Sequence, residues 1–212
     1  AAPQAIGNLL LATTPTNEFV DEVIEVGGYL FAAGDRGIDR YDIRARRWLT
    51  PILPDAGAWN IATDGTRIYS VGDESEIDVW ALNGSHIDTI GIGMSAEPTD
   101  LAWDALTGSI LMTLGEDGLA RVVVGTGSVD VWNENDDFQS GWAFQVAARD
   151  GVAYVAIEGE GVARVDLVSE DVLGSWRSSG VDEVEHAPIA VHGEHVYLGL
   201  SGAGVFVFNR TT

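Results

Sequence analysis

The chain contains no cysteine and no lysine among its 212 residues. The absence of cysteine excludes disulfide bonds, thiolate nucleophiles and zinc sites built from thiolates. All 11 residues of the Lys and Arg class are arginines, and 33 acidic residues outnumber them, so the formal net charge is −22. Because a surface of this sign repels phosphate, we expect neither nucleic-acid binding nor attraction to anionic membranes.

Long apolar runs are also missing. No run approaches the roughly 18 residues that a transmembrane helix needs, so we expect no membrane insertion. The length suits one domain or one repeat array, and the 46% apolar content is ordinary for a globular protein. The first residues, AAPQAIG, suit either a cleaved signal peptide or a chain boundary.

An internal repeat is the main positive feature. The segments EGEGVARVDL and SGAGVFVFNR are near copies, and three more copies precede them: GDRGIDRYDI, DESEIDVWAL and GEDGLARVVV. Their anchor positions recur every 39 to 43 residues, at Gly37, Glu76, Gly118, Gly161 and Gly204. A period of this length is typical of β-propeller blades.

Each copy carries four short runs rich in Val, Ile, Tyr and Trp, separated by Gly, Asp and Asn. Such runs predict four β-strands per unit, here termed A to D from the central channel outwards, with the anchor at the B–C turn. We therefore predict an all-β, five-bladed β-propeller in one domain, residues 1–212. The blades are expected at 19–53, 58–93, 98–133, 141–177 and 184–212.

The two ends of the repeat complement each other. The last unit lacks a strand D, whereas residues 6–14 match a strand D that leads into the first strand A. Pairing them would close the ring and remove an exposed sheet edge. The alternative is a piece of a larger propeller cut at the same phase, so we expect either a monomer or a module of a larger chain.

The repeats resemble known propeller families. IAVHGEHVYLGLSGAGVFVF resembles the LVIVD-type repeat, and GIDRYDIRARRWLT and GVARVDLVSEDVLGSW resemble the propeller repeats of hybrid two-component regulators. The resemblance covers nearly the whole chain, although Glu76 replaces glycine in the second copy. It implies an extracytoplasmic or cell-surface sensing or binding module, without a shared catalytic motif.

Polar residues recur at one position of strand A. The residue before the first buried apolar residue of each strand is Glu22, Asn60, Asp100, Gln145 or Pro188. Because strand A lines the channel, we expect the first four to form a polar ring near one mouth. Oxygen ligands of mixed charge suit Ca²⁺ or ordered water, with Glu22 and Asp100 as the candidate metal ligands.

The tryptophans fall into two groups. Trp48, Trp132 and Trp176 recur in strand D, which indicates packing between blades. Trp59 and Trp142 open strands A beside the polar ring, where they would either stack on a sugar or peptide side chain or fill the mouth. We predict a ligand-binding mouth formed by these two tryptophans and the ring residues.

Neither the histidines nor the acidic strings give a catalytic or metal motif. His192 and His195 flank a polar turn without a neighbouring third ligand, and the acidic string NENDDF is not spaced as an EF-hand loop. No nucleophile, base and orienting group emerge together, and no cofactor motif is present. The expected function is a non-enzymatic propeller that binds a protein or small molecule, without a cofactor.

One enzymatic alternative stays open. Some five-bladed propellers are glycoside hydrolases with carboxylates at the inner strand ends, and Glu22, Asp100 and Glu185 are the residues that would serve here. The motifs that flank those carboxylates in such enzymes are not found.

The acidic, lysine-free composition resembles that of salt-adapted proteins. The alternative explanation is a high-GC genome that encodes an acidic secreted protein. If self-repulsion limits stability, screening relieves it, so the melting temperature should rise steadily from low salt to molar KCl. Differential scanning calorimetry at constant pH measures this rise. A melting temperature independent of KCl would remove the halophilic explanation.

Overall fold

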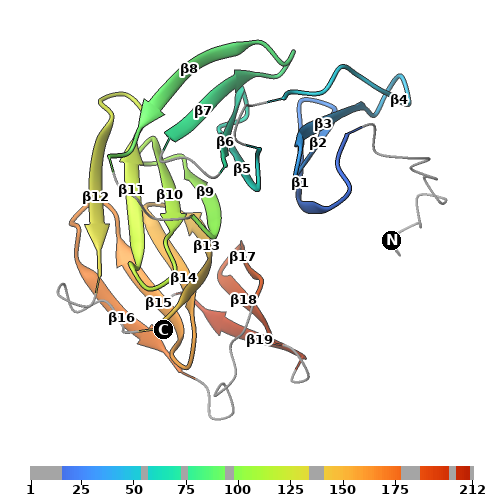
Figure 1. Cartoon of the computed structure of the whole chain (residues 1–212). Coiled ribbons are helices and arrows are strands. Elements are labelled where there is room, and N and C mark those ends of the chain that lie inside the picture. The colour runs from blue at the N-terminus through green and yellow to red at the C-terminus, as the bar shows by residue number, and fades with distance from the viewer. Residues whose placement is uncertain are drawn as a thin grey trace.

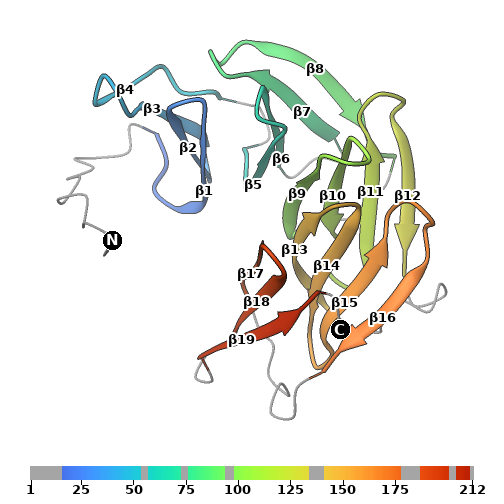
Figure 2. The same ribbon diagram turned by 180° about the vertical axis from the view of Figure 1, so that it is seen from behind.

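The computed structural model describes residues 16–53, 57–72, 76–93, 98–133, 141–177, 187–200 and 204–210. These ranges form nineteen β-strands in five antiparallel sheets that follow one another around an arc (Figure 1 and Figure 2). The fold is the all-β, five-bladed propeller that the repeat predicts. No helix in the described part of the chain is long and apolar enough to cross a membrane.

The blades are numbered in chain order. Blade 1 consists of β1 (Val20–Val26), β2 (Tyr29–Gly34), β3 (Gly37–Asp42) and β4 (Arg47–Trp48). Blade 2 consists of β5 (Asn60–Thr63), β6 (Arg67–Val71), β7 (Glu76–Ala81) and β8 (His86–Gly91). Blade 3 consists of β9 (Asp100–Asp104), β10 (Ser109–Thr113), β11 (Leu119–Val123) and β12 (Ser128–Trp132).

Blade 4 consists of β13 (Ala143–Arg149), β14 (Val152–Ile157), β15 (Gly161–Asp166) and β16 (Val172–Trp176). Blade 5 has three described strands, β17 (Ile189–His192), β18 (His195–Leu200) and β19 (Gly204–Asn209). In every blade, consecutive strands pair as antiparallel neighbours, and the first strand is the innermost. Residues 6–14, which we predict to complete blade 5, lie outside the described residues.

The core lies between the blades. Four apolar clusters occupy the four interfaces between successive blades. Strand β10 shows how one sheet serves two interfaces, because Ile110 and Met112 contact the cluster shared with blade 2, whereas Leu111 contacts the cluster shared with blade 4. All five residues of β10 are buried, whereas the outer strand β8 exposes five of its six. Side-chain alternation along a strand thus lets one sheet be buried on both faces.

Strand D of blade 1 departs from the regular pattern. The regular strand β4 has only two residues, although the sequence run RWLTPI suggests more. The regular pairing Tyr41–Trp48 and the later bridge Ile38–Ile52 are four positions apart on this strand and three on β3, so one extra residue interrupts the ladder, and Pro51 within this stretch has no N–H to donate. Pairing resumes at Ile52, which exchanges two backbone hydrogen bonds with Ile38 (2.8 and 2.9 Å).

The inner strands contact each other in chain order, β1 with β5, β5 with β9, β9 with β13 and β13 with β17. Blades 1 and 5 stand at the two ends of the arc (Figure 1), and no comparable contact joins β1 to β17 among the described strands.

The anchor glycines lie at the B–C turns, where the sequence predicts them. Gly118 has a φ of +89°, and a Cβ there would lie 2.2 Å from the carbonyl oxygen of Trp132 in strand D. A Cβ on Gly161 would likewise lie 2.3 Å from the carbonyl oxygen of Trp176. Glycine suits this position for two reasons: it tolerates the positive φ, and its lack of a Cβ leaves room for the outer strand.

Gly204 is the equivalent glycine of blade 5 and provides a test of the predicted closing strand. Its φ is +91°, and no described atom lies within 4 Å of the position that a Cβ would take. If residues 6–14 pair with β19, Gly204→Ala should cost as much stability as Gly118→Ala, which we expect to be at least about 2 kcal/mol.

Gly65→Ala is the matched control, because Gly65 has a φ of +89° with nothing within 4 Å. The loss of stability in Gly65→Ala should therefore reflect backbone strain alone. Urea unfolding measures all three variants. A cost for Gly204→Ala equal to that of Gly65→Ala would argue against a fourth strand on blade 5.

Candidate functional site

The mouth at which the inner strands begin is the candidate site. Each strand A starts at this end, and the B–C turns return to it. For example, the N–H of Ala143, at the start of β13, donates to the carbonyl oxygen of Gly115 in the B–C turn of blade 3 (3.0 Å). Segments from successive blades therefore meet at this mouth.

The predicted ring residues connect each inner strand to the next. Glu22 Oε2 accepts a hydrogen bond from the N–H of Ile61 in β5 (2.7 Å), and Asp100 Oδ2 accepts one from Val146 in β13 (2.8 Å). Gln145 Oε1 accepts one from Ile189 in β17 (3.2 Å).

Asn60 makes a related bond with the opposite polarity, from Nδ2 to the carbonyl oxygen of Pro98 (3.2 Å). Each ring residue thus reaches the chain of the following blade at or just before its inner strand.

These bonds have a clear physical reason. An innermost strand pairs on one edge only, so backbone groups on its channel edge need other partners when they are buried. The ring side chain of the preceding blade supplies one. A β-bulge just before Glu22 in β1 and another just before Gln145 in β13 change the local direction of the strand at these positions.

The two ring carboxyls have strongly raised pKa values. Burial raises the pKa of Glu22 to about 8, against the opposing effect of the hydrogen bond from Ile61, and the nearby Asp100 raises it further. Burial also raises the pKa of Asp100 to about 7. The negative charge of Asp100 thus acts on Glu22, although the two carboxyls belong to blades 1 and 3.

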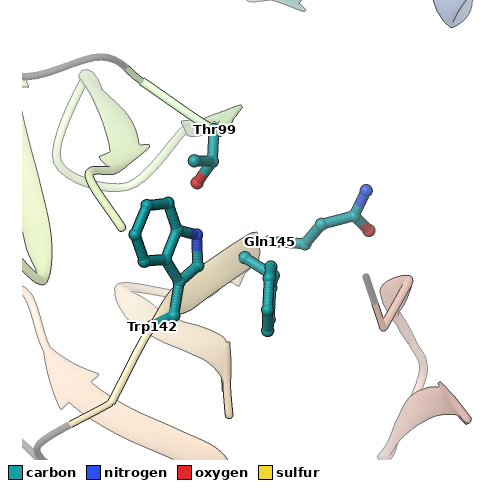
Figure 3. A pocket seen from close by; sticks show the side chains of 4 residues that line it. Thr99, Trp142 and Gln145 are labelled. Carbon is teal, nitrogen blue, oxygen red and sulfur yellow. The ribbon is translucent and has the colours of Figure 1, made fainter. Parts of the chain in front are cut away.

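A cavity of about 490 Å³ opens beside the ring. Figure 3 shows Thr99, Trp142 and Gln145 around it, and Phe144 completes the described lining. The indole nitrogen of Trp142 lies on the side of the ring that faces Gln145 (Figure 3). Trp142 is 40% exposed, so an unusually large aromatic surface is open to a ligand.

Neighbouring groups hold Trp142 and Thr99 in place. A Cβ on Gly115 would lie 2.8 Å from Cζ2 of Trp142, so the indole packs directly on this glycine. The hydroxyl of Thr99 lies 2.8 Å from the carbonyl oxygen of Ala143 and 2.8 Å from Oγ1 of Thr113. The cavity wall is therefore built by blades 3 and 4 together.

The structure brings some of the predicted site residues together and separates others. Trp142 and Gln145 line the cavity, whereas Glu22, Asn60 and Asp100 are not part of its described lining. Asp100 directly follows the lining residue Thr99 in the chain. Trp59 is partly buried at the start of blade 2 and is not part of the described lining. Thr99 and Phe144 are not among the residues predicted from the sequence, although each directly precedes a ring residue, which is the pattern that could have indicated them.

The predicted metal site has only two acidic residues. Within the described ranges, no group of three or more His, Asp or Glu side chains is arranged to hold a metal ion. Glu185 and most of NENDDF lie outside the described residues. Ca²⁺ binding by Glu22 and Asp100 stays a prediction.

The raised pKa values predict how stability depends on pH. Between about pH 4 and pH 8 the native carboxyls keep protons that the unfolded chain has lost, so the unfolding free energy should fall as the pH rises through this range. Glu22→Gln keeps an acceptor for Ile61 and removes the titration. It should therefore reduce the fall and raise stability at about pH 9 by about 1–2 kcal/mol, after allowance for partial exposure.

Thermal unfolding of the wild type and Glu22→Gln at several pH values measures this effect. Asp21→Asn is the control, since Asp21 is an exposed acid on the same strand. Parallel stability curves for the wild type and Glu22→Gln would show that Glu22 titrates normally.

No family model matches the chain, and no curated protein matches it. The resemblance to LVIVD-type and two-component-regulator repeats thus stays a prediction from the repeat pattern.

Solved structures show similarity at the level of the fold. U3-55K has a TM-score of 0.75 at 16% identity, covering 94% of this chain and 63% of its own. The WD40 repeats of RRP9 give 0.74 at 16% identity, covering 94% and 62%. The computationally designed Ika8 protein gives 0.69 at 13% identity, covering 88% and 57%. The chain thus spans about six tenths of the length of each of these structures, and the likeness is one of fold alone.

Proposed function

We propose that this chain is a non-enzymatic binding propeller that holds a protein or small-molecule ligand at the mouth where its inner strands begin. The observation that carries the proposal is the cavity lined by Thr99, Trp142, Phe144 and Gln145. Concave sites with aromatic walls and a few polar groups are the usual form of ligand sites. Loops of successive blades also converge there, which gives a partner contacts with several blades.

The chemistry of the lining suits a ligand with both a flat face and polar groups. The exposed indole of Trp142 offers a stacking surface, and its N–H is a hydrogen-bond donor. Gln145 lines the same cavity, with its amide directed away from the indole (Figure 3). A sugar ring or a planar peptide side chain has this combination of surfaces.

The glycoside hydrolase remains a second candidate because of one observation. Glu22 and Asp100 interact electrostatically and have raised pKa values, and a raised pKa suits a general acid. A hydrolase also needs an ionised partner carboxylate, whereas both carboxyls here are shifted upwards. Each carboxyl is also hydrogen-bonded to the next inner strand, which favours binding over catalysis.

Net charge and the repeat resemblance support the proposed class of partner, the proposed location and the proposed monomeric state. The net charge of −22 disfavours nucleic acid as a partner. The resemblance to surface and sensor repeats supports an extracytoplasmic location. A large net charge of one sign also favours a monomer over self-association.

Fluorine NMR tests the proposal through Trp142. The seven tryptophans are replaced by 5-fluorotryptophan, and Trp142→Phe assigns the resonance of Trp142. Methyl glycosides and short aromatic peptides are then titrated. A ligand of the mouth should shift the Trp142 resonance, and Gln145→Ala should weaken its binding about tenfold.

Leu173→Ala is the matched control, because Leu173 is 43% exposed on the outer strand β16. Binding that moves other tryptophans and not Trp142 would contradict a site at the mouth. Release of a free sugar from a glycoside, abolished by Glu22→Gln, would instead establish the hydrolase.

A further inference from the structure

We propose that the cavity at the mouth takes a guanidinium group, presented by an arginine side chain of a peptide partner. This inference rests on the proposed function, because it names the ligand class of the same cavity. Three independent features support it: the aromatic wall, the acids beside it and the distribution of charge between the two ends of the propeller.

The aromatic wall suits a planar cation. Trp142 is held flat against Gly115, and its exposed face borders the cavity. Indole has the strongest cation–π attraction among the aromatic side chains, and guanidinium stacks on it more readily than ammonium because it is planar and weakly hydrated. The chain itself contains this pairing, since the guanidinium of Arg164 lies 4.4 Å from the ring centroid of Trp176.

The acids beside the cavity lack a described cation. Neither acid belongs to the described lining of the cavity, but Asp100 follows the wall residue Thr99 in the chain. Its Oδ2 accepts a hydrogen bond from Val146, which follows the wall residue Gln145, and the negative charge of Asp100 acts in turn on Glu22. Each carboxyl uses one oxygen to hold the next inner strand, and no described salt bridge includes either of them. A guanidinium in the cavity would stabilise their ionised forms, which burial now disfavours.

The turns around the mouth carry an excess of negative charge. Described B–C turns of blades 1, 3 and 4 contribute five acids to this end: Asp35, Glu116, Asp117, Glu158 and Glu160. Two described arginines lie at this end, Arg36 and Arg177. Arg36 forms an ion pair with Glu18, and Arg177 forms one with Glu160.

The opposite end of the propeller holds most of the arginines. Six of them lie in or beside the A–B and C–D turns, where the strands run away from the mouth: Arg44, Arg46, Arg47, Arg67, Arg149 and Arg210. Two of these side chains, Arg149 and Arg210, pair with Asp150. Eight acids lie in or beside the same turns, so this end is acidic as well: Asp42, Asp64, Asp104, Asp150, Asp166, Glu170, Asp171 and Glu194. Its six arginines nevertheless offset a larger share of its negative charge than the two arginines at the mouth do, so the mouth keeps the larger share of acids without a nearby arginine and is the end that attracts a cation.

The charged groups on the strands packed around Glu22 and Asp100 define the expected pH dependence. Strands β5 and β10 contain no Asp, Glu, His, Lys or Arg. On β13 the charged residue is Arg149, which ends the strand away from the mouth. On β9 the second acid, Asp104, also lies at the far end, bonded to Thr107 and Gly151.

On β1, Asp21 and Glu25 are exposed. Glu22 and Asp100 are therefore the half-buried acids near the cavity, and a cationic ligand should displace their protons.

The experiment uses three pentapeptides, Gly-Gly-X-Gly-Gly, in which X is arginine, citrulline or lysine. Citrulline keeps the shape of arginine without its charge, and lysine keeps the charge without the planar group. Binding is followed by the fluorotryptophan resonance of Trp142 at about 0.15 M salt, which screens diffuse attraction to the acidic surface. The arginine peptide should bind at least about tenfold more tightly than either of the others.

Variants then separate the charge from the aromatic wall. Asp100→Asn with Glu22→Gln should reduce the affinity for the arginine peptide about tenfold and leave that for citrulline unchanged. Trp142→Ala should weaken the binding of both peptides. The control Asp21→Asn, which removes an exposed acid, should change neither affinity. In the wild type the affinity for arginine should rise between about pH 6 and pH 9, whereas the double variant should show no such rise.

The outcomes distinguish this inference from the proposed function. Equal shifts of Trp142 by arginine and citrulline would overturn the guanidinium preference and leave a binding mouth in place. Equal binding of arginine and lysine would overturn the planar-cation argument. Arginine binding that survives Trp142→Ala would show only general attraction to an acidic surface, and no binding of the arginine peptide would also overturn the inference.

Discussion

A blade can be buried only by its neighbours, and this constraint governs the whole structure. A four-stranded antiparallel sheet has two faces, and an apolar face must be covered by another element. The four clusters between successive blades meet the need by placing apolar side chains of every inner blade on both faces. The same packing problem recurs at each blade, which explains why the chain repeats one pattern with a nearly constant period.

The polar ring is a second consequence of the same arrangement. Blades that fan outwards from a channel bring their inner strands close without allowing them to pair as a continuous sheet. Glu22, Asp100 and Gln145 bridge this separation by accepting backbone hydrogen bonds from the next strand. A structural role and a ligand role are compatible here, because each carboxylate has a second oxygen. The raised pKa values of Glu22 and Asp100 follow from holding acids in this confined place.

The sequence predicts the blades well because their determinants are local. Gly118 and Gly161 mark turns with positive φ, and the apolar runs around them mark the strands. The cavity is harder to predict, since it depends on how blade 3 is placed against blade 4. The sequence indicates that Trp142 and Gln145 begin an inner strand, but it does not show that the indole packs on Gly115. The sequence does place Glu22 and Asp100 in one ring, because they hold the same position in two repeats, but it does not show that burial raises their pKa values.

The uneven burial of the strands has a consequence for how the native protein opens. Strand β8 exposes five of its six residues, so it can detach from blade 2 with little loss of apolar contact. Strand β10 is buried throughout and serves two interfaces, so its amides are freed only when blades 2, 3 and 4 separate together. Amide hydrogens should therefore exchange with solvent early along the rim of the propeller and last in the middle of blade 3. The centre of blade 3 is thus the part of the molecule whose opening coincides with global unfolding.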